Sequence, residues 1–586
     1  MRNEKDNNVF KYLRRRVLDF SLKNSINEER TYLGLTIITG ILSALVAVSL
    51  YKSVEFLKHI SGTDQTFTPK SFGIGFVLVF ISGWLTTRKF PSTSGSGIPG
   101  VRVALAVFHG KIGFLDSVAK FVVSALSLGS GVSLGREGPT AAISAGIGSS
   151  LGSFFHLSKK RVKALVAVGS AGGIAAAFNT PMAAVVFTLE EVVGDLNAKV
   201  LGSIIISSVV ASVVGQFFLG TSTVFTELNY QLNNISEIPL YCSVGVVCAI
   251  SGSLWMKSVT TFRKYSLSIF KGHRLSLISA TFVTIALIGQ LNHHVLGSGH
   301  ETIEHALLNL FSDWKTLISL FTLKFIATTI SYGSGISGGL FMPTLLLGAS
   351  LGGFIGSISQ MVFPEISPNI GAFALIGMGA FFASVIKAPF TSILMIFELT
   401  RDYNIILPLM ISNIISYAIS LALDKNSIYE SISEQDGIHL PKKEDYEILD
   451  TFIVEEAMVR DVEFLNSDDL IIDAYQKTKE TSISGFPVVK NNSLFGMVSS
   501  NEVGAAKVRQ DCNQKTIESI CMKKVIKIYP DQSLMYALHL LDKFHISRLP
   551  VVSRLDDKNV IGIITANDIT HRFGLHVSEE INEEKK

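Results

Sequence analysis

The chain has 586 residues, of which 48% are hydrophobic and only 17% are charged, and its formal net charge is +3. Together with a mean hydropathy of +0.40, this composition is typical of a membrane protein, and so small a net charge gives no indication of nucleic-acid binding. The four cysteines (Cys242, Cys248, Cys512 and Cys521) form no CxxC pair, so we expect free thiols, no disulfide framework and no structural zinc or other metal site.

The first thirty residues are polar and basic and include Arg14, Arg15 and Arg16. A secretory signal has its apolar run closer to the start of the chain, so this segment is not one. The positive-inside rule places it in the cytoplasm. We therefore expect a cytoplasmic N-terminal segment at 1–30.

Several long stretches contain no Asp, Glu, Lys or Arg, and each is long enough, or nearly so, to cross a bilayer. Among them are residues 31–51, 71–87, 164–189, 238–256, 325–364 and 403–423. The basic run KKRVK at 159–163 is predicted to be a cytoplasmic loop between two spans. From about Asn426 charges recur every few residues, which indicates a soluble domain after the membrane part.

An internal repeat organises the membrane part. SLGSGVSLGREGPTAAISAGIGSSLG at 127–152 aligns without a gap to SYGSGISGGLFMPTLLLGASLGGFIG at 331–356, and NTPMAAVVFTLE at 179–190 aligns to KAPFTSILMIFE at 387–398. A membrane domain made of two related halves indicates a transporter or channel whose substrate site lies where the halves meet. Gly and Pro in matching places of both halves predict broken helices near the midplane.

The spacing G-x-G-x-x-G occurs twice, as GSGIPG at 95–100 and GSGISG at 333–338. A dinucleotide fingerprint would need a preceding strand and an acidic residue about twenty positions later, and neither copy has that context. Glycines still allow backbone N–H groups to approach an anion at a helix N-terminus. No Walker A, serine-nucleophile or metalloprotease motif is present, so we expect a transporter and not an enzyme.

The glutamates of the membrane part differ in what the sequence predicts for them. Glu137 lies in an apolar, glycine-rich segment, where a carboxylate costs about 3 kcal/mol at the bilayer centre; either it is functional or it forms a buried ion pair with Arg136. Glu190 aligns with Glu398, which predicts structural residues at helix ends. Glu191 has no counterpart, so it is either an added functional group or a solvated acid at a helix end.

The soluble tail contains its own repeat. SISGFPVV at 482–489 matches HISRLPVV at 545–552, and GMVSSNEV at 496–503 matches GIITANDI at 562–569. Each copy predicts a helix, a strand after a proline, and a Gly-initiated strand that runs into a helix start of the form Ser/Thr-x-x-acid. These two copies resemble the cystathionine-β-synthase (CBS) pair.

The membrane part resembles the CLC family of chloride channels and chloride/proton exchangers. GSGIPG at 95–100, GREGP at 135–139 and GLFMP at 339–343 match its three filter segments in order, and Tyr429 of SIYES lies where the family has a pore tyrosine. The resemblance implies an all-α polytopic membrane domain with two inverted-topology repeats at 31–435. A cytoplasmic α/β CBS-pair domain would follow at 436–586, with copies at about 452–510 and 515–575.

Carried over residue by residue, the resemblance implies that the hydroxyls of Ser96 and Tyr429 bind a central chloride, with the amides of Leu340 and Phe341. Amides near Gly95 and Ser96 would form an inner site, and amides of the GREGP segment an outer one. Serine at position 96, where nitrate-preferring members tend to have proline, favours chloride. The remaining residues of the filter motifs are Gly97, Ile98, Pro99, Gly135, Arg136, Gly138, Pro139, Gly339, Met342 and Pro343.

The resemblance also implies roles for two glutamates. Glu137 would be the gate and outer proton carrier, and Glu191 would take protons from the cytoplasm. Both are present, so we favour secondary active exchange of chloride for protons. A passive, gated chloride channel on the same scaffold is the first alternative, and a nucleotide sensor that has lost transport is the second.

For the CBS pair, the resemblance implies an adenine nucleotide at Thr565 and Asp568, or at Ser499 and Glu502. Alternatively, these residues only cap helices as capping boxes. No cofactor is expected to be required. The expected partners are chloride, protons, the lipid bilayer and a second copy in a homodimer, and the expected location is a bacterial inner (plasma) membrane with both termini cytoplasmic.

Overall fold

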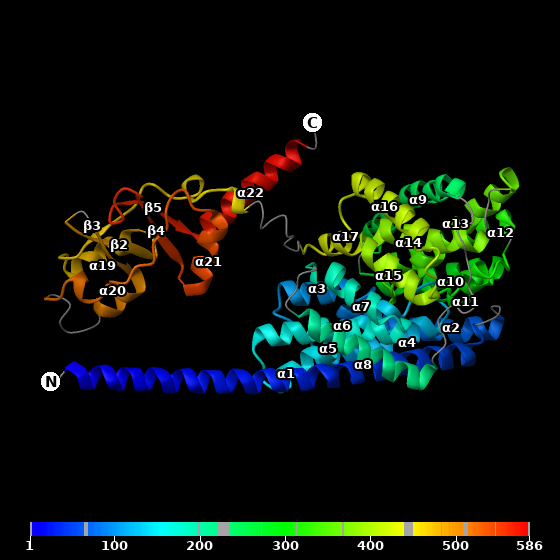
Figure 1. Ribbon diagram of the computed structural model, residues 1–586, viewed down its shortest axis with the longest axis horizontal. Helices are drawn as coiled ribbons and strands as arrows, with labels where there is room; N and C mark the ends of the chain where they lie inside the picture. Colours follow the sequence, from blue (N-terminus) through cyan, green and yellow to red (C-terminus); the bar gives the residue numbers. More distant parts are fainter. Residues whose placement is uncertain are drawn as a thin grey trace. The chain divides into compact units, whose positions relative to one another are not determined.

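The structure is a computed structural model of the chain, drawn in Figure 1. It describes residues 3–63, 68–195, 200–220, 235–270, 272–311, 313–365, 369–438, 449–481, 483–491, 493–507, 514–544 and 546–583, without the side chains of 3–27, 267 and 575–583. The chain divides into two compact units, Met1–Leu440 and Pro441–Lys586. In the ranges described, the first unit is helical, and the second combines helices with short strands.

The helical unit is built from two halves with the same order of helices. The first half contains α1 (Asn3–Ser61), α2 (Pro69–Arg88), α3 (Ile98–Ala106), α4 (Phe114–Gly129), α5 (Glu137–Phe154), α6 (Lys159–Phe178), α7 (Pro181–Phe187), a π-helical turn (Thr188–Val193) and α8 (Leu201–Leu219). The second half contains α9 (Ile238–Ile269), α10 (Arg274–Leu291), α11 (His300–Leu307), α12 (Trp314–Gly333), α13 (Phe341–Val362), α14 (Ile370–Ile386), α15 (Pro389–Thr400) and α16 (Ile406–Leu423). A short helix, α17 (Ile428–Gln435), follows them.

Packing repeats between the halves as well. Helix α1 packs on α6 and α8, as α9 packs on α14 and α16, and the pair α5–α6 corresponds to α13–α14. Glycines bring these paired helices together: a Cβ on Gly148 would collide with the Leu165 carbonyl, and one on Gly348 would collide with the Gly377 carbonyl. Small residues at such contacts are the usual way in which membrane helices approach closely.

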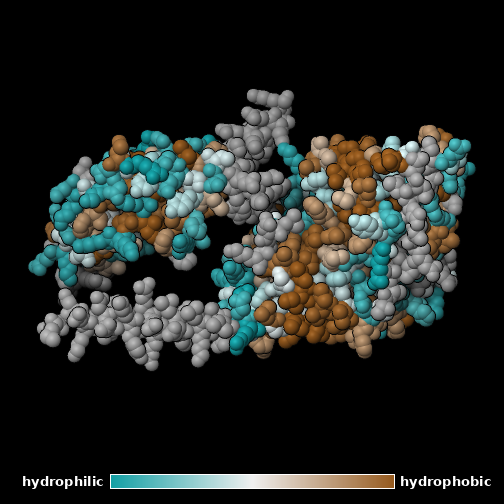
Figure 2. All heavy atoms as spheres, viewed as in Figure 1, coloured by the Kyte–Doolittle hydropathy of each residue, from teal (hydrophilic) through white to brown (hydrophobic). Residues whose placement is uncertain are grey.

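Nine helices within the described ranges are long and apolar enough to cross a membrane. Large apolar side chains on their outer faces are exposed, among them Ile37, Phe80, Val213 and Leu287. Figure 2 shows hydrophobic side chains gathered over the face of this unit that the view presents. An apolar surface of this extent is suited to lipid.

The broken helices predicted from the repeat are present. The charge-free stretch 325–364 is not one span, because α12 ends at Gly333 and α13 begins at Phe341. The matching break separates α4, which ends at Gly129, from α5, which begins at Glu137. Each break leaves the N-terminus of a helix inside the protein, since Glu137 and Phe341 are both buried.

The prediction of a loop at 159–163 is wrong, because KKRVK forms the first turn of α6. Arg161 stacks on the ring of Tyr32 at 4.4 Å and pairs with Glu29 at 3.2 Å. The positive-inside rule concerns the side of the membrane on which a basic run lies. It does not distinguish a loop from the polar first turn of a helix.

The second unit contains the two predicted copies. The first comprises α19 (Ile471–Glu480), β2 (Gly485–Lys490), β3 (Ser493–Ser499) and α20 (Ser500–Lys507), and the second comprises α21 (Leu534–Phe544), β4 (Arg548–Val552), β5 (Val560–Thr565) and α22 (Ala566–Glu583). Strands β2 and β3 are antiparallel, as are β4 and β5, and β1 (Leu465–Asn466) runs parallel to β2. The prolines lie inside β2 and β4, at Pro487 and Pro550, and not before the strands as predicted.

Each copy is completed by a segment that precedes the other copy. Val454 packs in the core of the second copy, and its N–H donates to Gln532 O at 2.8 Å. Ile517 packs in the core of the first copy, and its N–H donates to Asp469 O at 3.0 Å. The two copies therefore exchange short segments, so neither core is complete without residues from the other part of the repeat.

Candidate functional site

The three glycine-rich motifs meet through backbone hydrogen bonds. Gly338 N donates to Gly95 O at 3.1 Å, Gly135 N donates to Gly339 O at 2.8 Å, and Gly339 N donates to Gly135 O at 2.6 Å. These bonds join the segments that lead into α3, α5 and α13. The N-termini of three helices are thereby fixed around one region, and unpaired N–H groups at helix N-termini favour an anion.

Two glycines make this approach possible. Gly97, the residue before α3, has φ of 91°, a conformation that residues with a Cβ rarely adopt. Gly138, in the first turn of α5, faces Ser96, so that a Cβ at this position would lie 2.5 Å from Ser96 Oγ and 3.3 Å from Gly339 Cα. The spacing of the glycines therefore reflects contact between the motifs and not a nucleotide fold.

The two hydroxyl residues predicted to bind the central anion are both buried. Ser96 is 1% exposed and Tyr429 is 0% exposed. Ser96 Oγ accepts from Ile98 N at 3.4 Å, within the turn that also contains Pro99. The Tyr429 hydroxyl has no hydrogen-bond partner among the described residues. A buried hydroxyl without a partner is costly unless a ligand satisfies it, so its position fits a bound anion.

The N-terminus of α13 is held in place by aromatic packing. The ring of Phe341 lies against those of Phe178, Phe382 and Phe187, at centroid distances of 4.8, 4.8 and 5.4 Å. Leu340 precedes the helix, and Pro343 in its first turn has no N–H to satisfy. Because the side chains of Leu340 and Phe341 pack in the core, the backbone of this turn is the part that can bind an anion.

Glu137 begins α5 and is 3% exposed. Its carboxyl group faces the backbone N–H groups of Arg136, Glu137 and Met342, and its Oε2 atom has no hydrogen-bond partner among the described residues. The ion pair with Arg136 is weak in geometry, with Nε to Oε1 at 4.0 Å, because the guanidinium stacks on Tyr51 at 4.1 Å. The Glu137 carboxylate thus lies in a nest of backbone amides, where it resembles an anion more than a member of an ion pair.

Glu190 and Glu398 are helix-end residues, as the repeat alignment predicted. Glu398 in α15 accepts from Met182 N at 3.0 Å and Ala183 N at 2.7 Å, at the N-terminus of α7. Glu190, after α7, accepts from Thr391 N at 3.0 Å and Thr391 Oγ1 at 2.8 Å, at the N-terminus of α15. Each glutamate therefore caps the helix of the other half.

Glu191 differs from both of these glutamates. It is 5% exposed and pairs with Arg102 of α3. Ser427 Oγ donates to Glu191 Oε1 at 3.0 Å, and Arg102 also donates to Glu430 at 3.0 Å. The reading of Glu191 as a solvated acid is therefore wrong, because its carboxylate is buried and is held by Arg102 and Ser427.

Two lysines that sequence reasoning missed support the site. Lys120 of α4 donates to Thr93 O at 2.8 Å and Gly95 O at 2.6 Å, and is 4% exposed. Lys324 of α12 donates to Val295 O at 2.9 Å and Gly297 O at 2.8 Å. The positions are 204 residues apart, the offset of the sequence repeat, so the repeat alignment could have paired them. Lys120 thus fixes the backbone that leads into the GSGIPG motif through two carbonyl groups.

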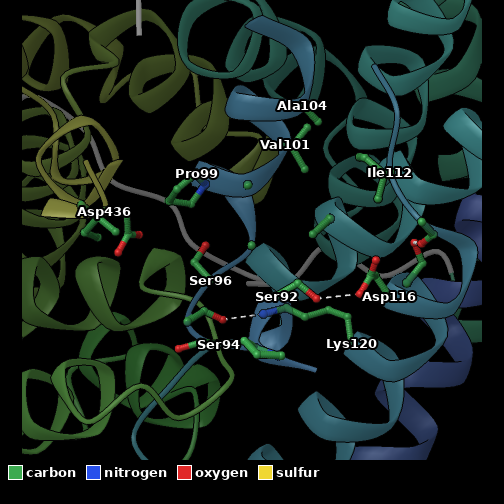
Figure 3. A pocket seen from close by; sticks show the side chains of 18 of the residues that line it. Ser92, Ser94, Ser96, Pro99, Val101, Ala104, Ile112, Asp116, Lys120 and Asp436 are labelled. Carbon is green, nitrogen blue, oxygen red and sulfur yellow. Dashed lines mark hydrogen bonds between the residues drawn. The ribbon is translucent and has the colours of Figure 1, made fainter. Parts of the chain in front are cut away.

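A cavity of about 530 Å³ opens beside this motif. Its lining includes Ser96, Lys120 and Tyr332 near the motif, and Arg263 and Arg274 elsewhere. Figure 3 shows Ser96, Pro99 and Lys120 around this space, with Ser92 donating to Asp116 at 2.8 Å. Its charged lining consists of Lys111, Lys120, Arg263 and Arg274 with Asp116 and Asp436. Basic side chains therefore outnumber acidic ones around the cavity, which favours approach of an anion.

The turns of the CBS copies are closed by capping boxes. Ser499 N and Oγ both donate to Glu502 Oε2 at 2.8 Å. Thr565 N and Oγ1 donate to Asp568 Oδ2 at 2.8 and 2.6 Å. Capping is therefore a role that all four residues have in this structure.

Comparison with known proteins identifies the two regions. The family model described as voltage gated chloride channel matches residues 78–421, and the CBS domain model matches 454–504 and 517–574. The H(+)/Cl(-) exchange transporter ClcA of Vibrio cholerae serotype O1 is 30% identical over 413 residues, which cover 68% of this chain and 88% of the relative. A putative chloride channel protein ClcB-like of Ralstonia nicotianae is 32% identical over 348 residues, covering 58% of this chain and 80% of the relative.

Solved structures agree with this result. The X-ray structure of a slow cyanobacterial Cl-/H+ antiporter matches with a TM-score of 0.64 and 25% identity, over 69% of this chain and 98% of that one. A eukaryotic CLC transporter matches with a TM-score of 0.66 and 19% identity, over 92% of this chain and 98% of the other, which supports the fold. The chain is a multi-pass membrane protein with a CBS pair, and it belongs to the voltage gated chloride channel (CLC) family.

Proposed function

We propose that this protein is a secondary active antiporter that exchanges chloride for protons. The observation that carries the proposal is the combination of two buried glutamates of different kinds: Glu137 in a nest of backbone amides and Glu191 in a network of ionisable side chains. A channel needs only an anion path. A second buried acid, on a different element from the first, supplies a place for a proton. The similarity to the exchange transporter ClcA supports the same conclusion.

The anion path in this proposal runs past Ser96 and Tyr429. The Tyr429 hydroxyl and the amides of Leu340 and Phe341 bind the central chloride with Ser96, while amides near Gly95 and those of the GREGP segment hold inner and outer ions. Amides and hydroxyls bind an anion without a full counter-charge, so the ion can leave again. Ser96 Oγ accepts from a backbone N–H, that of Ile98, at 3.4 Å.

Glu137 is the gate in this mechanism. As an ionised group it occupies the outer anion site and competes with chloride for the same amides. Protonation removes the charge that holds the side chain there, so it leaves and an anion takes its place. Each departure therefore moves a proton and admits an ion, which is how one side chain links the two fluxes.

Glu191 is the inner proton acceptor, and the membrane orientation follows from this role. We propose that Glu191 faces the cytoplasmic side, that both termini are cytoplasmic and that the membrane is a bacterial inner membrane. The protein is proposed to be a homodimer with an anion path in each subunit. Mass measurement of the purified protein in detergent distinguishes a dimer from a monomer.

For the CBS pair we propose binding of an adenine nucleotide as a regulatory ligand. Because Asp568 Oδ2 is used by its own helix, the nucleotide would use the second carboxylate oxygen. Arg548 lies near enough to Asp568 to interact with its charge, while its guanidinium donates to Gly485 O at 2.8 Å and to Ser484. Calorimetry with ATP on the full-length protein tests this proposal, and the absence of heat of binding would reject it.

Proton movement in sealed vesicles tests the exchange itself. Purified protein is reconstituted, a chloride gradient is imposed, and an external electrode records pH. Uphill proton movement that reverses with the chloride gradient is the expected result. Chloride flux without proton movement would instead establish the gated channel, and no anion flux at all would leave only the nucleotide-sensing role of the tail.

A further inference from the structure

Arg102 connects the inner glutamate to the helix that carries the pore tyrosine. It lies on α3, one turn after the GSGIPG motif begins that helix, and its side chain is 12% exposed. One end of its guanidinium pairs with Glu191, and the other pairs with Glu430 of α17 at 3.0 Å. Glu430 directly follows Tyr429 in the chain. A single arginine therefore joins a proton site and the anion-site helix.

The network around Arg102 is closed by the cap of α17. Ser427 Oγ donates to Glu191 Oε1 at 3.0 Å and accepts from Glu430 N at 3.3 Å, while Ser427 N donates to Glu430 Oε2 at 3.2 Å. The two carboxylates thus accept from different atoms of the same two residues, Arg102 and Ser427. A change in the charge of one carboxylate alters the bonds available to the other.

The charges in the network do not balance when both acids are ionised. Two carboxylates and one guanidinium carry a net charge of −1, and the uptake of one proton makes the group neutral. Neutrality is favoured where the environment is poorly solvated. The side chain of Glu430 is 22% exposed and that of Glu191 is 6% exposed, so Glu430 is the acid nearer to water.

We propose that Arg102 is a positioning residue that Glu191 and Glu430 share, so that the trio takes up one proton and Glu430 is its solvent-facing member. When Glu191 becomes protonated, Arg102 is held by Glu430 alone, which alters the bonds at the N-terminus of α17 next to Tyr429. Proton uptake and the anion site are in this way connected through one guanidinium. This inference rests on the proposed exchange and adds the residues that deliver the proton.

The proposal predicts opposite effects for removal of each charge. Arg102→Gln leaves two facing carboxylates without a cation, so Glu191 takes up its proton at higher pH. In Glu430→Gln, Glu191 is the one carboxylate of the trio that remains charged beside Arg102, so Glu191 takes up its proton at lower pH. An opposite charge within ~4–6 Å shifts such an equilibrium by about 1–3 pH units, and we expect a shift of about one pH unit in each direction. Glu190 and Tyr429 also interact electrostatically with Glu191, and both variants retain them.

Chloride-driven proton movement in vesicles, measured against the pH on the Glu191 side, gives the pH of half-maximal transport for each variant. Chloride flux in the same vesicles shows that the variant has folded. Arg102→Lys keeps the charge, and its half-maximal pH is expected to stay close to that of the wild type, because a cation still faces the two carboxylates. A purely structural arginine would instead make Arg102→Lys and Arg102→Gln behave alike.

Arg263→Gln is the matched control. Arg263 of α9 also binds α17, through Asp436 at 2.7 Å and Gln435 at 3.1 Å, but these residues lie at the other end of that helix. Its removal is expected to leave the half-maximal pH unchanged, even if the rate of chloride flux changes. This control distinguishes a pH shift caused by weaker packing of α17 from one caused by a change in charge around Glu191.

The outcomes separate this inference from the proposed function. Shifts in opposite directions for Arg102→Gln and Glu430→Gln, with near-normal behaviour of Arg102→Lys, support the shared arginine. Coupled exchange with no shift in either variant, or with shifts in the same direction, would overturn the inference and leave exchange intact. No proton movement in the wild-type protein would overturn both.

Discussion

Replacement of Gly138 by alanine tests whether the filter depends on contact between α5 and the GSGIPG motif. The added Cβ would lie 2.5 Å from Ser96 Oγ and 3.0 Å from Ser96 O. Carbon and oxygen atoms that are not bonded normally remain well over 3 Å apart. Ser96 must therefore move, and with it one of the two hydroxyls assigned to the central chloride.

The size of the effect follows from this overlap. Insertion of a methyl group into a closely packed region costs about 1–3 kcal/mol, which corresponds to a change of roughly 5- to 150-fold in an equilibrium constant. If the strain falls on the occupied anion site, chloride affinity decreases by that factor. Calorimetric titration of purified protein with chloride measures the affinity, and vesicle efflux measures the flux.

Gly73→Ala is the control, because a Cβ on Gly73 of α2 has no neighbouring atom within 4 Å. This variant is expected to keep the wild-type affinity and flux. Wild-type chloride affinity in a folded Gly138→Ala protein would refute the reasoning, since it would mean that Ser96 can move without effect on the ion.

Three further predictions concern the charged residues of the site. Glu137→Gln removes the ionisable gate, so chloride flux should persist while proton coupling is lost; proton movement retained in vesicles would contradict the assignment. Glu191→Gln should also abolish uphill proton movement. Glu190→Gln should retain it, because the glutamine carbonyl oxygen can still accept from Thr391 N and Thr391 Oγ1; equal coupling ratios in the two variants would show that the pair is not functionally divided. Lys120→Met leaves the carbonyls of Thr93 and Gly95 without this donor, at a cost of about 1–3 kcal/mol. It should weaken chloride binding about tenfold or more in the same titration. Unchanged affinity would show that the hydrogen bonds of Lys120 do not shape the filter.

Several features of the fold could be predicted because they are local or repeated. The absence of charge over a membrane length indicates the membrane part, although the stretch 325–364 contains a helix break. The repeat predicted broken helices at matching places of the two halves, and the structure has them before Glu137 and Phe341. The alignment also separated Glu190 from Glu191. A loop was predicted at 159–163 because a basic run is as compatible with the first turn of a helix as with a loop, and only the backbone hydrogen bonds of α6 distinguish them.

The sequence by itself determined that the chain spans a membrane, that it consists of two related halves and a CBS pair, and that its glycine motifs suit an anion. Tertiary structure alone decided which charged groups meet. Arg102 is 89 residues from Glu191 and 328 residues from Glu430, and Lys120 is 25 residues from the carbonyl of Gly95. Contacts of this kind depend on how helices pack, because a pattern in the chain specifies the face of a helix and not the residue that it will meet.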